Sequence, residues 1–276
     1  MLSLDISHIK SSMARLTPQR NLFSIVVAIR KVNFTLVWFV LFFSLFPELL
    51  KLNLLKSWDA LLGLQNIINV ANVISIGVYF VLDAIVNYVL IPQAENKRKD
   101  DFIDNSFGSK FSIVSSIEYY NNEEISAGLY KGAVNLFQNC FFSASLMKAA
   151  LPQKIVLPAI ILLGVMIMAY FGFKQFDWAV ALLQTLFSVS ILGSLVKDLI
   201  LYYQLNAIQD MWVALFQNKD VKLNIASYHA QVYRYWLQYE TLISWSQPDI
   251  PEKLYNRLNG PLTAEWQNLK TKYNIL

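Results

Sequence analysis

Four long stretches without a charged residue constrain this chain more than any motif in it. They cover residues 32–47, 60–82, 155–173 and 178–196, and each is 16 to 23 residues long. A helix rises about 1.5 Å per residue and a bilayer core is about 30 Å thick, so each stretch is long enough to cross a membrane once. The sequence therefore predicts an all-α integral membrane protein, with four transmembrane helices in two hairpins and a cytoplasmic all-helical domain.

The composition agrees with this fold class. Apolar residues make up 55% of the chain and charged residues only 15%, whereas soluble domains have about 45–50% apolar and about 25% charged residues. The net charge of +4 is small and scattered, so no surface for DNA or RNA is expected. The single cysteine, Cys140, excludes an internal disulfide.

The charges outside the apolar stretches predict an orientation. Five cationic residues and one acidic residue, Asp5, precede the first stretch. The cations are Lys10, Arg15, Arg20, Arg30 and Lys31. Each of the two hairpin turns has as many acidic as basic residues. Because positive flanks stay on the cytoplasmic side, we expect a multi-pass protein with both termini and the central segment in the cytoplasm.

Five regions are expected along the chain. Residues 1–31 form a basic amphipathic N-terminal helix, and 32–91 form the first transmembrane hairpin with a cytoplasmic extension. Residues 92–154 are a cytoplasmic helical insertion, 155–196 the second hairpin, and 197–276 a helical tail that packs with 92–154.

Prolines and glycines set the expected helix ends. Pro92 is the first residue expected to break the helix that leaves the second stretch, and Pro152 is expected to close an amphipathic helix over 123–150. After Pro251, one short helix is expected to stop at Gly260 and a second to begin near Thr263, a residue type favoured at N-caps.

A polar stripe runs along the second apolar stretch. Its members recur at helical spacing, so they fall on one face of the helix. These pore-lining candidates are Gln65, Asn69, Asn72, Ile76, Tyr79, Asp83 and Asn87. Either the amides bond across a helix interface and hold a bundle together, or copies of the helix surround a hydrated path. In the second interpretation, Ile76 is a hydrophobic constriction and Asp83 stands at the cytoplasmic mouth. Gln184 and Ser188 are a weaker pair, for packing or for the same path.

Nothing in the chain predicts an enzyme. Asp100, Asp101 and Asp104 have a spacing that can hold Mg²⁺, but the three cations at 97–99 favour a solvated, salt-bridged helix face. The two histidines, His8 and His229, lie in separate segments, so neither a metal site nor a cofactor is expected.

The cytoplasmic aromatic residues have two interpretations. Tyr119, Tyr120, Tyr235 and Trp236 are either core of a helical domain or surfaces that stack on a planar ligand or a partner.

The middle of the chain resembles a known family. The resemblance is carried by DFIDNSFG (101–108), EYYNN (118–122), Lys131, NLFQNCFF (135–142) and the closing pattern of 254–258 with Glu265 and Trp266. These segments resemble the SMODS-associated four-transmembrane effectors of bacterial CBASS-type antiphage defence. The resemblance implies a toxic effector of the bacterial inner membrane that causes abortive infection. It brings no catalytic residue with it, and it adds Lys131 to the candidate ligand- or partner-binding residues.

Two hypotheses for function follow. The first is a homo-oligomeric pore or ion channel, surrounded by membrane lipids and opened by an infection signal, with a cyclic oligonucleotide as the candidate ligand. The alternative is a non-conducting membrane scaffold or accessory subunit that docks a cytoplasmic partner.

Overall fold

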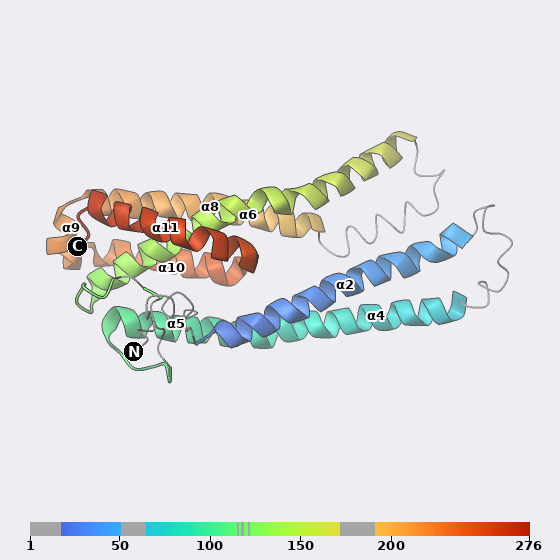
Figure 1. Cartoon of the computed structure of the whole chain (residues 1–276), viewed down its shortest axis with the longest axis horizontal. Helices are drawn as coiled ribbons and strands as arrows, with labels where there is room; N and C mark the ends of the chain where they lie inside the picture. The colour runs from blue at the N-terminus through green and yellow to red at the C-terminus, as the bar shows by residue number, and fades with distance from the viewer. Residues whose placement is uncertain (1–17, 51–64, 115, 117–118, 121, 172–190) are drawn as a thin grey trace, which may run out of the picture. The chain divides into compact units, whose positions relative to one another are not determined.

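The computed structural model describes residues 18–50, 65–114, 116, 119–120, 122–171 and 191–276. Every regular element in these residues is helical (Figure 1), which confirms the all-α prediction for this part of the chain. The elements in chain order are α2 (Arg20–Leu50), α4 (Gln65–Ile85), the π-helical turn η1 (Val86–Leu90), α5 (Ile91–Phe107), α6 (Leu129–Phe171), α8 (Ile191–Gln217), α9 (Asp220–Leu223), the 3-10 turn η3 (Ile225–Tyr228), α10 (His229–Ser246) and α11 (Glu252–Lys272).

Three helices in the described residues are long and apolar enough to cross a membrane. They are Arg20–Ser44, Asn66–Phe107 and Leu129–Gly164. Only 11–25% of the most apolar part of each is buried within the chain. Such exposed apolar surface is compatible with a lipid environment. The fourth predicted stretch, 178–196, lies mostly outside the described residues, and so do Gln184 and Ser188.

The chain divides into two compact units. The apolar unit contains Ile25–Ile91 and Met147–Tyr202, and the helical unit contains Pro92–Leu146 and Tyr203–Leu276 with residues 18–24. The unit boundaries fall inside α2, α6 and α8 and at the start of α5. The expected division into five regions also concerns membrane placement, and it stays a prediction.

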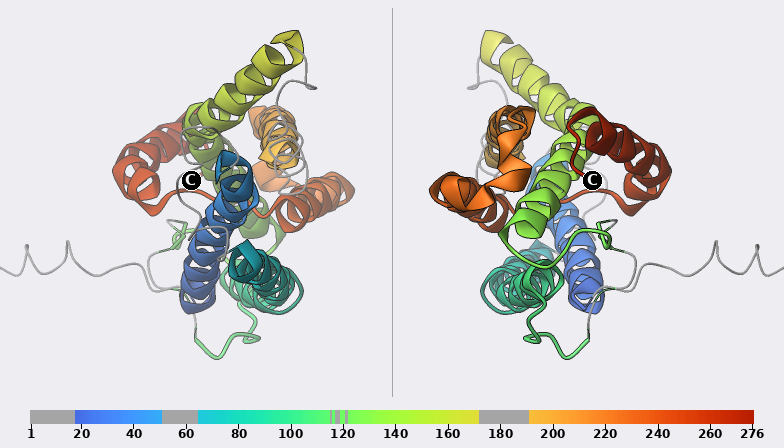
Figure 2. Two further views of the ribbon diagram at one scale, coloured as in Figure 1. Left: turned by 90° about the vertical axis from the view of Figure 1, so that its right-hand side faces the viewer. Right: turned by 90° about the vertical axis from the view of Figure 1, so that its left-hand side faces the viewer.

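In the apolar unit, α2 and α4 lie side by side (Figures 1 and 2). Near one end, Val26 of α2 is buried in a cluster with Val86 and Ile91. Toward the other end, the Asn72 side chain donates a hydrogen bond to Ser44 of α2 at 3.1 Å. Contacts at both ends define an antiparallel hairpin, as the first two apolar stretches predict.

Pro92 does not break the helix, contrary to expectation. α4 continues through η1 into α5, and the backbone N–H of Ile91 donates to the carbonyl of Val86, five residues earlier. A proline lacks an N–H, and its ring clashes with the carbonyl four residues before it. The wider π turn directly before Pro92 relieves this clash, so the chain keeps its helical course.

Two other predicted helix ends are also wrong. Pro152 lies inside α6, which continues to Phe171. Gly260 and Pro261 lie inside α11, where Thr263 donates its hydroxyl hydrogen to the carbonyl of Asn259 at 2.7 Å instead of capping a new helix. One proline removes one backbone hydrogen bond, and packing along the rest of a long helix offsets that loss.

Large aromatic side chains form the core of the helical unit. Phe137 of α6 lies between Trp266 of α11, with ring centroids 5.2 Å apart, and Phe216 of α8, at 5.3 Å. Trp212 of α8 is fully buried, and its ring centroid is 5.2 Å from that of Tyr235 on α10. Each such ring buries about 150–250 Å², so these contacts hold four helices together.

Candidate functional site

The residues of the polar stripe on α4 differ in how far their side chains are exposed. Asn69 is exposed and Ile76 is 37% exposed, whereas Asn72, Tyr79, Asp83 and Asn87 are half-buried. Asn87 donates from Nδ2 to Asp83 at 2.9 Å, one helical turn away. Gln65 begins α4, but its side chain lies outside the described part. The structure thus keeps the predicted residues on one helix, and their role as a pore lining stays a prediction.

Two amide side chains of the stripe have hydrogen-bonding atoms without a partner among the described residues. The Oδ1 atom of Asn72 is buried and has no hydrogen-bond partner, and Asn69 makes no hydrogen bond to the described residues. The remaining exposed face of α4 is apolar, including Val70, Val73 and Ile74. An amide left without a partner in hydrocarbon costs several kcal/mol. The exposed Asn69 amide therefore requires water or a second protein surface if this helix crosses a membrane, whereas the Asn72 oxygen is enclosed within the chain.

The aspartates of the DDxxD segment order a loop. Asp101 is 2% exposed and accepts a hydrogen bond from the backbone N–H of Ser116 at 2.7 Å. Asp104 accepts from the Ser109 hydroxyl at 2.8 Å and from the backbone N–H groups of Phe111 and Ser112 at 2.8 and 2.7 Å. The interpretation as a solvated, salt-bridged face was therefore wrong for Asp101 and Asp104, because both carboxylates accept backbone hydrogen bonds from the following loop.

The neighbouring cations are also engaged within the helical unit. Arg98 bridges Glu95 of its own helix, with Nη2 at 2.8 Å, and Glu240 of α10. All three side chains are 11–13% exposed. Lys99 donates to the Ser244 hydroxyl at 3.3 Å. These bonds fasten α5 to α10.

A network of buried amides, missed by the sequence reasoning, lies beside these aspartates. The Nδ2 atom of Asn122 donates to the side-chain oxygens of Asn135 and Gln138, both at 2.8 Å. Asn135 then donates to Asn105 at 2.9 Å and Ser106 at 3.1 Å. Three amides at positions 135, 138 and 139 of a helix that is otherwise apolar there were the available signal, because buried amides need partners.

The predicted ligand-binding aromatic residues are mostly packed against other aromatic rings of the helical unit. The Trp236 ring stacks on Phe107 with centroids 6.1 Å apart and meets Phe102 edge-on at 5.2 Å. Tyr120 is buried, and this desolvation raises its pKa well above the usual value. Tyr235 and Lys131 are also buried. The structure does not bring these four residues into one pocket with Tyr119, and whether they bind a ligand stays a prediction.

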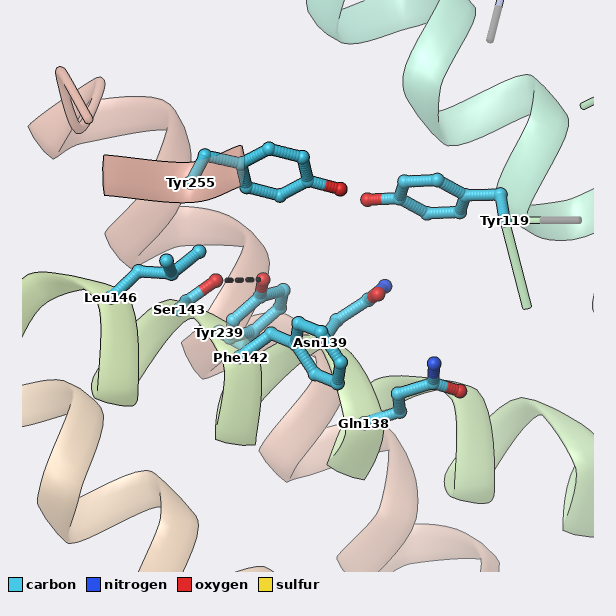
Figure 3. Close-up of a pocket in the computed structure, with 8 residues that line it drawn as sticks. All are labelled: Tyr119, Gln138, Asn139, Phe142, Ser143, Leu146, Tyr239 and Tyr255. Carbon is cyan, nitrogen blue, oxygen red and sulfur yellow. Dashed lines mark hydrogen bonds between the residues drawn. The ribbon is translucent and has the colours of Figure 1, made fainter. Parts of the chain in front are cut away.

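Tyr119 does line a pocket, together with residues of α6, α10 and α11. The cavity has a volume of about 100 Å³. Its lining residues are Tyr119, Gln138, Asn139, Phe142, Ser143, Leu146, Tyr239 and Tyr255. In Figure 3 the hydroxyls of Tyr119 and Tyr255 point toward one another across the opening, above the two amides. The lining is uncharged, so electrostatics favours a neutral ligand.

The base of this pocket is held by specific hydrogen bonds. Ser143 and Tyr239 share one at 3.0 Å (Figure 3). Burial raises the pKa of Tyr239, so its hydroxyl stays protonated. Asn139 donates from Nδ2 to the Tyr120 hydroxyl at 3.3 Å, and Gln138 accepts from Asn122. The bond from Asn122 therefore orients the Gln138 amide.

Metal ligands do not gather anywhere in the described residues. No group of three or more His, Cys, Asp or Glu side chains is placed to hold an ion there. Cys140 is a buried free thiol whose Sγ donates to the carbonyl of Leu205 at 3.6 Å.

No protein-family model matches the chain, and no curated protein or solved structure matches it significantly.

Proposed function

We propose that the chain is a bacterial inner-membrane effector of antiphage defence, with both termini in the cytoplasm. Copies of it assemble and open a pore on an infection signal, a cyclic oligonucleotide being the candidate. The α4 stripe lines the conducting path, with Ile76 as its constriction and Asp83 at its cytoplasmic end. The resemblance of segments 101–108 and 135–142 to the four-transmembrane effectors supports the defence role.

One observation supports the pore hypothesis most directly. Asn69 and Asn72 lie on an apolar helix, yet Asn69 has no hydrogen bond to the described residues and the Asn72 carbonyl oxygen has no partner. Water in a path between copies of α4 hydrates the exposed Asn69 amide, which removes its desolvation cost.

A second function is favoured by a different contact. The bond from Asn72 to Ser44 joins two helices of one hairpin, as an interhelical hydrogen bond does in a membrane bundle, where it contributes about 0.6 kcal/mol. In this alternative the protein is a non-conducting scaffold or accessory subunit, and the stripe only holds helices together.

Ion leakage from liposomes that contain the purified full chain tests the proposal. The liposomes are loaded with a fluorescent dye and assayed alone and with a panel of cyclic di- and trinucleotides. The pore predicts leakage, and its dependence on one nucleotide identifies the signal. Sealed liposomes throughout, with the protein shown to be inserted, contradict the pore and support the scaffold.

Two double variants separate lining from packing. Asn69→Leu with Asn72→Leu removes the polar groups of the stripe, and Val70→Leu with Ile74→Leu changes the exposed apolar face of the same helix. The pore predicts that only the first pair lowers the leakage, by about tenfold or more, without loss of assembly. Loss of assembly in the first pair favours the scaffold.

A further inference from the structure

A second pocket of the helical unit is lined by the end of α8, by α9 and by the segment that follows α11. Its volume is about 340 Å³. Small-molecule sites commonly measure about 300–1,000 Å³, and a cavity of about 150 Å³ holds one benzene ring. The pocket therefore has room for a ring together with a second chemical group.

Two lysines line this pocket without an acidic residue beside them in its lining. Lys219 is the N-cap of α9 and Lys222 lies in its last turn, three residues later, so the two are neighbours on the helix surface. Both are exposed, and neither makes a hydrogen bond or an ion pair with the described residues. Two like charges this close together favour an anion between them, and lysine binds phosphate as a point charge.

Aromatic rings line the pocket as well. The ring centroid of Tyr130 is 6.2 Å from that of Phe216, and the Tyr130 hydroxyl donates to the carbonyl of Ile275 at 3.0 Å. These two contacts hold the Tyr130 ring in place. Tyr273 is half-buried, and its ring centroid is 6.2 Å from that of Phe137. Such partly exposed rings are surfaces on which planar bases stack.

We propose that this pocket binds one nucleotide, with the phosphate between Lys219 and Lys222 and the base against Tyr130 and Tyr273. All four side chains belong to the helical unit. For the natural ligand the inference rests on the proposed function, because each unit of a cyclic oligonucleotide joins a planar base to a phosphate. The pocket is then the place where the helical unit receives the signal.

Binding of AMP and UMP to the full chain in lipid nanodiscs, measured by calorimetry, tests the proposal. Adenosine and uridine are the matched controls without a phosphate, and inorganic phosphate is the control without a base. Saturable binding of at least one nucleotide is expected, about tenfold or more tighter than binding of its nucleoside or of phosphate alone. Added salt is expected to weaken the binding of the nucleotide.

Lysine variants connect this binding to the pocket. Lys219→Met with Lys222→Met keeps two long side chains but removes both charges, and it breaks no contact with the described residues. The double variant is expected to weaken nucleotide binding about tenfold or more. Lys253→Met is the matched control, because Lys253 is exposed on α11 and does not line the pocket. It is expected to leave binding unchanged.

Tyr273 provides a second pair of variants. Tyr273→Leu removes the ring and is expected to weaken nucleotide binding severalfold, whereas Tyr273→Phe keeps the ring and is expected to preserve binding.

Three outcomes overturn the inference. They are the absence of saturable binding of AMP and UMP at millimolar concentration, equal binding of a nucleotide and its nucleoside, and nucleotide binding that the double lysine variant leaves unchanged. Failure of the pore looks different: the nucleotide binds through the two lysines, yet liposomes that contain the protein stay sealed. Leakage opened by a cyclic nucleotide to the same extent in the wild type and the double lysine variant overturns this site but not the pore.

Discussion

Some charged side chains stabilise the helical unit through ion pairs, and the sequence pattern does not reveal which residues pair. Lys270 is only 1% exposed, and its Nζ lies 3.4 Å from the carboxylate of Glu124. The pKa of Glu124 lies below its usual value, because its own backbone N–H and then Lys270 favour the ionised form. A carboxyl with a lowered pKa stabilises the fold above its unfolded-state pKa of about 4.3, and that contribution is lost as pH falls through the folded-state pKa.

We therefore predict that Glu124→Gln lowers the free energy of unfolding at pH 7 by about 1 kcal/mol. The difference from wild type shrinks as the pH falls below about 4, because wild-type Glu124 is then protonated as well. Thermal unfolding at several pH values measures this. Glu123→Gln is the matched control, since Glu123 is exposed and makes no contact of this kind. An equal difference at pH 7 and pH 3 would contradict the pairing.

A second prediction at the scale of single residues concerns Arg98. Its guanidinium is the bridge between Glu95 and Glu240, and all three groups are nearly buried. Arg98→Met leaves two carboxylates close together without a cation, so we expect a loss of about 3–5 kcal/mol in unfolding free energy. Chemical denaturation in detergent measures it. Lys97→Met, at an exposed position one residue earlier, is expected to change little, and an equal loss there would refute the assignment.

Residue-level chemistry was the hardest part to predict from sequence. The DDxxD spacing is typical of metal sites and of solvated helix faces alike. Only the fold reveals that Asp101 and Asp104 receive hydrogen bonds from a loop 5 to 15 residues later in the chain. The amides of Asn122 and Gln138 come from different segments, so no local pattern could pair them.

At the scale of helices, periodicity and charge predicted most elements. The helices over residues 32–47 and 65–82 were predicted from the uncharged stretches, and the predicted helical tail 197–276 contains the end of α8 together with α10 and α11. The predicted ends at Pro92, Pro152 and Gly260 lie inside helices, and the helix predicted from residue 123 begins at Leu129. Local rules treat proline as a helix end, whereas a π turn or a long helix on both sides accommodates it. Helix existence was therefore predictable, but these boundaries depend on tertiary packing.

The prolines of α11 allow a test of this explanation. Pro261 is exposed in the middle of the helix, whereas Pro251 precedes its first residue. Proline in a helix interior costs about 3 kcal/mol and proline at a helix start costs little. We predict that Pro261→Ala raises the free energy of unfolding by about 1–3 kcal/mol, while Pro251→Ala changes it little. Thermal unfolding monitored by circular dichroism measures both variants. A Pro261→Ala protein that is less stable than wild type would contradict this cost of Pro261.

At the scale of the whole molecule, the chain contains an apolar unit with little buried surface and a helical unit with a buried aromatic core. At most a quarter of the most apolar part of each candidate span is buried within the chain. Contact of such an apolar surface with lipid or protein is more favourable than contact with water. Lipid offers no hydrogen-bond partner to the amides of the α4 stripe, so this face favours contact with protein or water.

Cysteine accessibility along α4 tests the central claim most directly. Cys140 is the only cysteine in the chain, so Cys140→Ala gives a background without thiols. Single cysteines are then placed at Asn69 and Asn72 on the stripe, and at Val70 and Ile74 on the exposed apolar face. The protein in liposomes is treated with a charged, water-soluble thiol reagent while leakage is recorded.

The account predicts fast modification of Asn69→Cys and Asn72→Cys with a change in leakage, and no modification of Val70→Cys or Ile74→Cys. Modification at all four positions, or at none, would contradict a hydrated path along this face of α4.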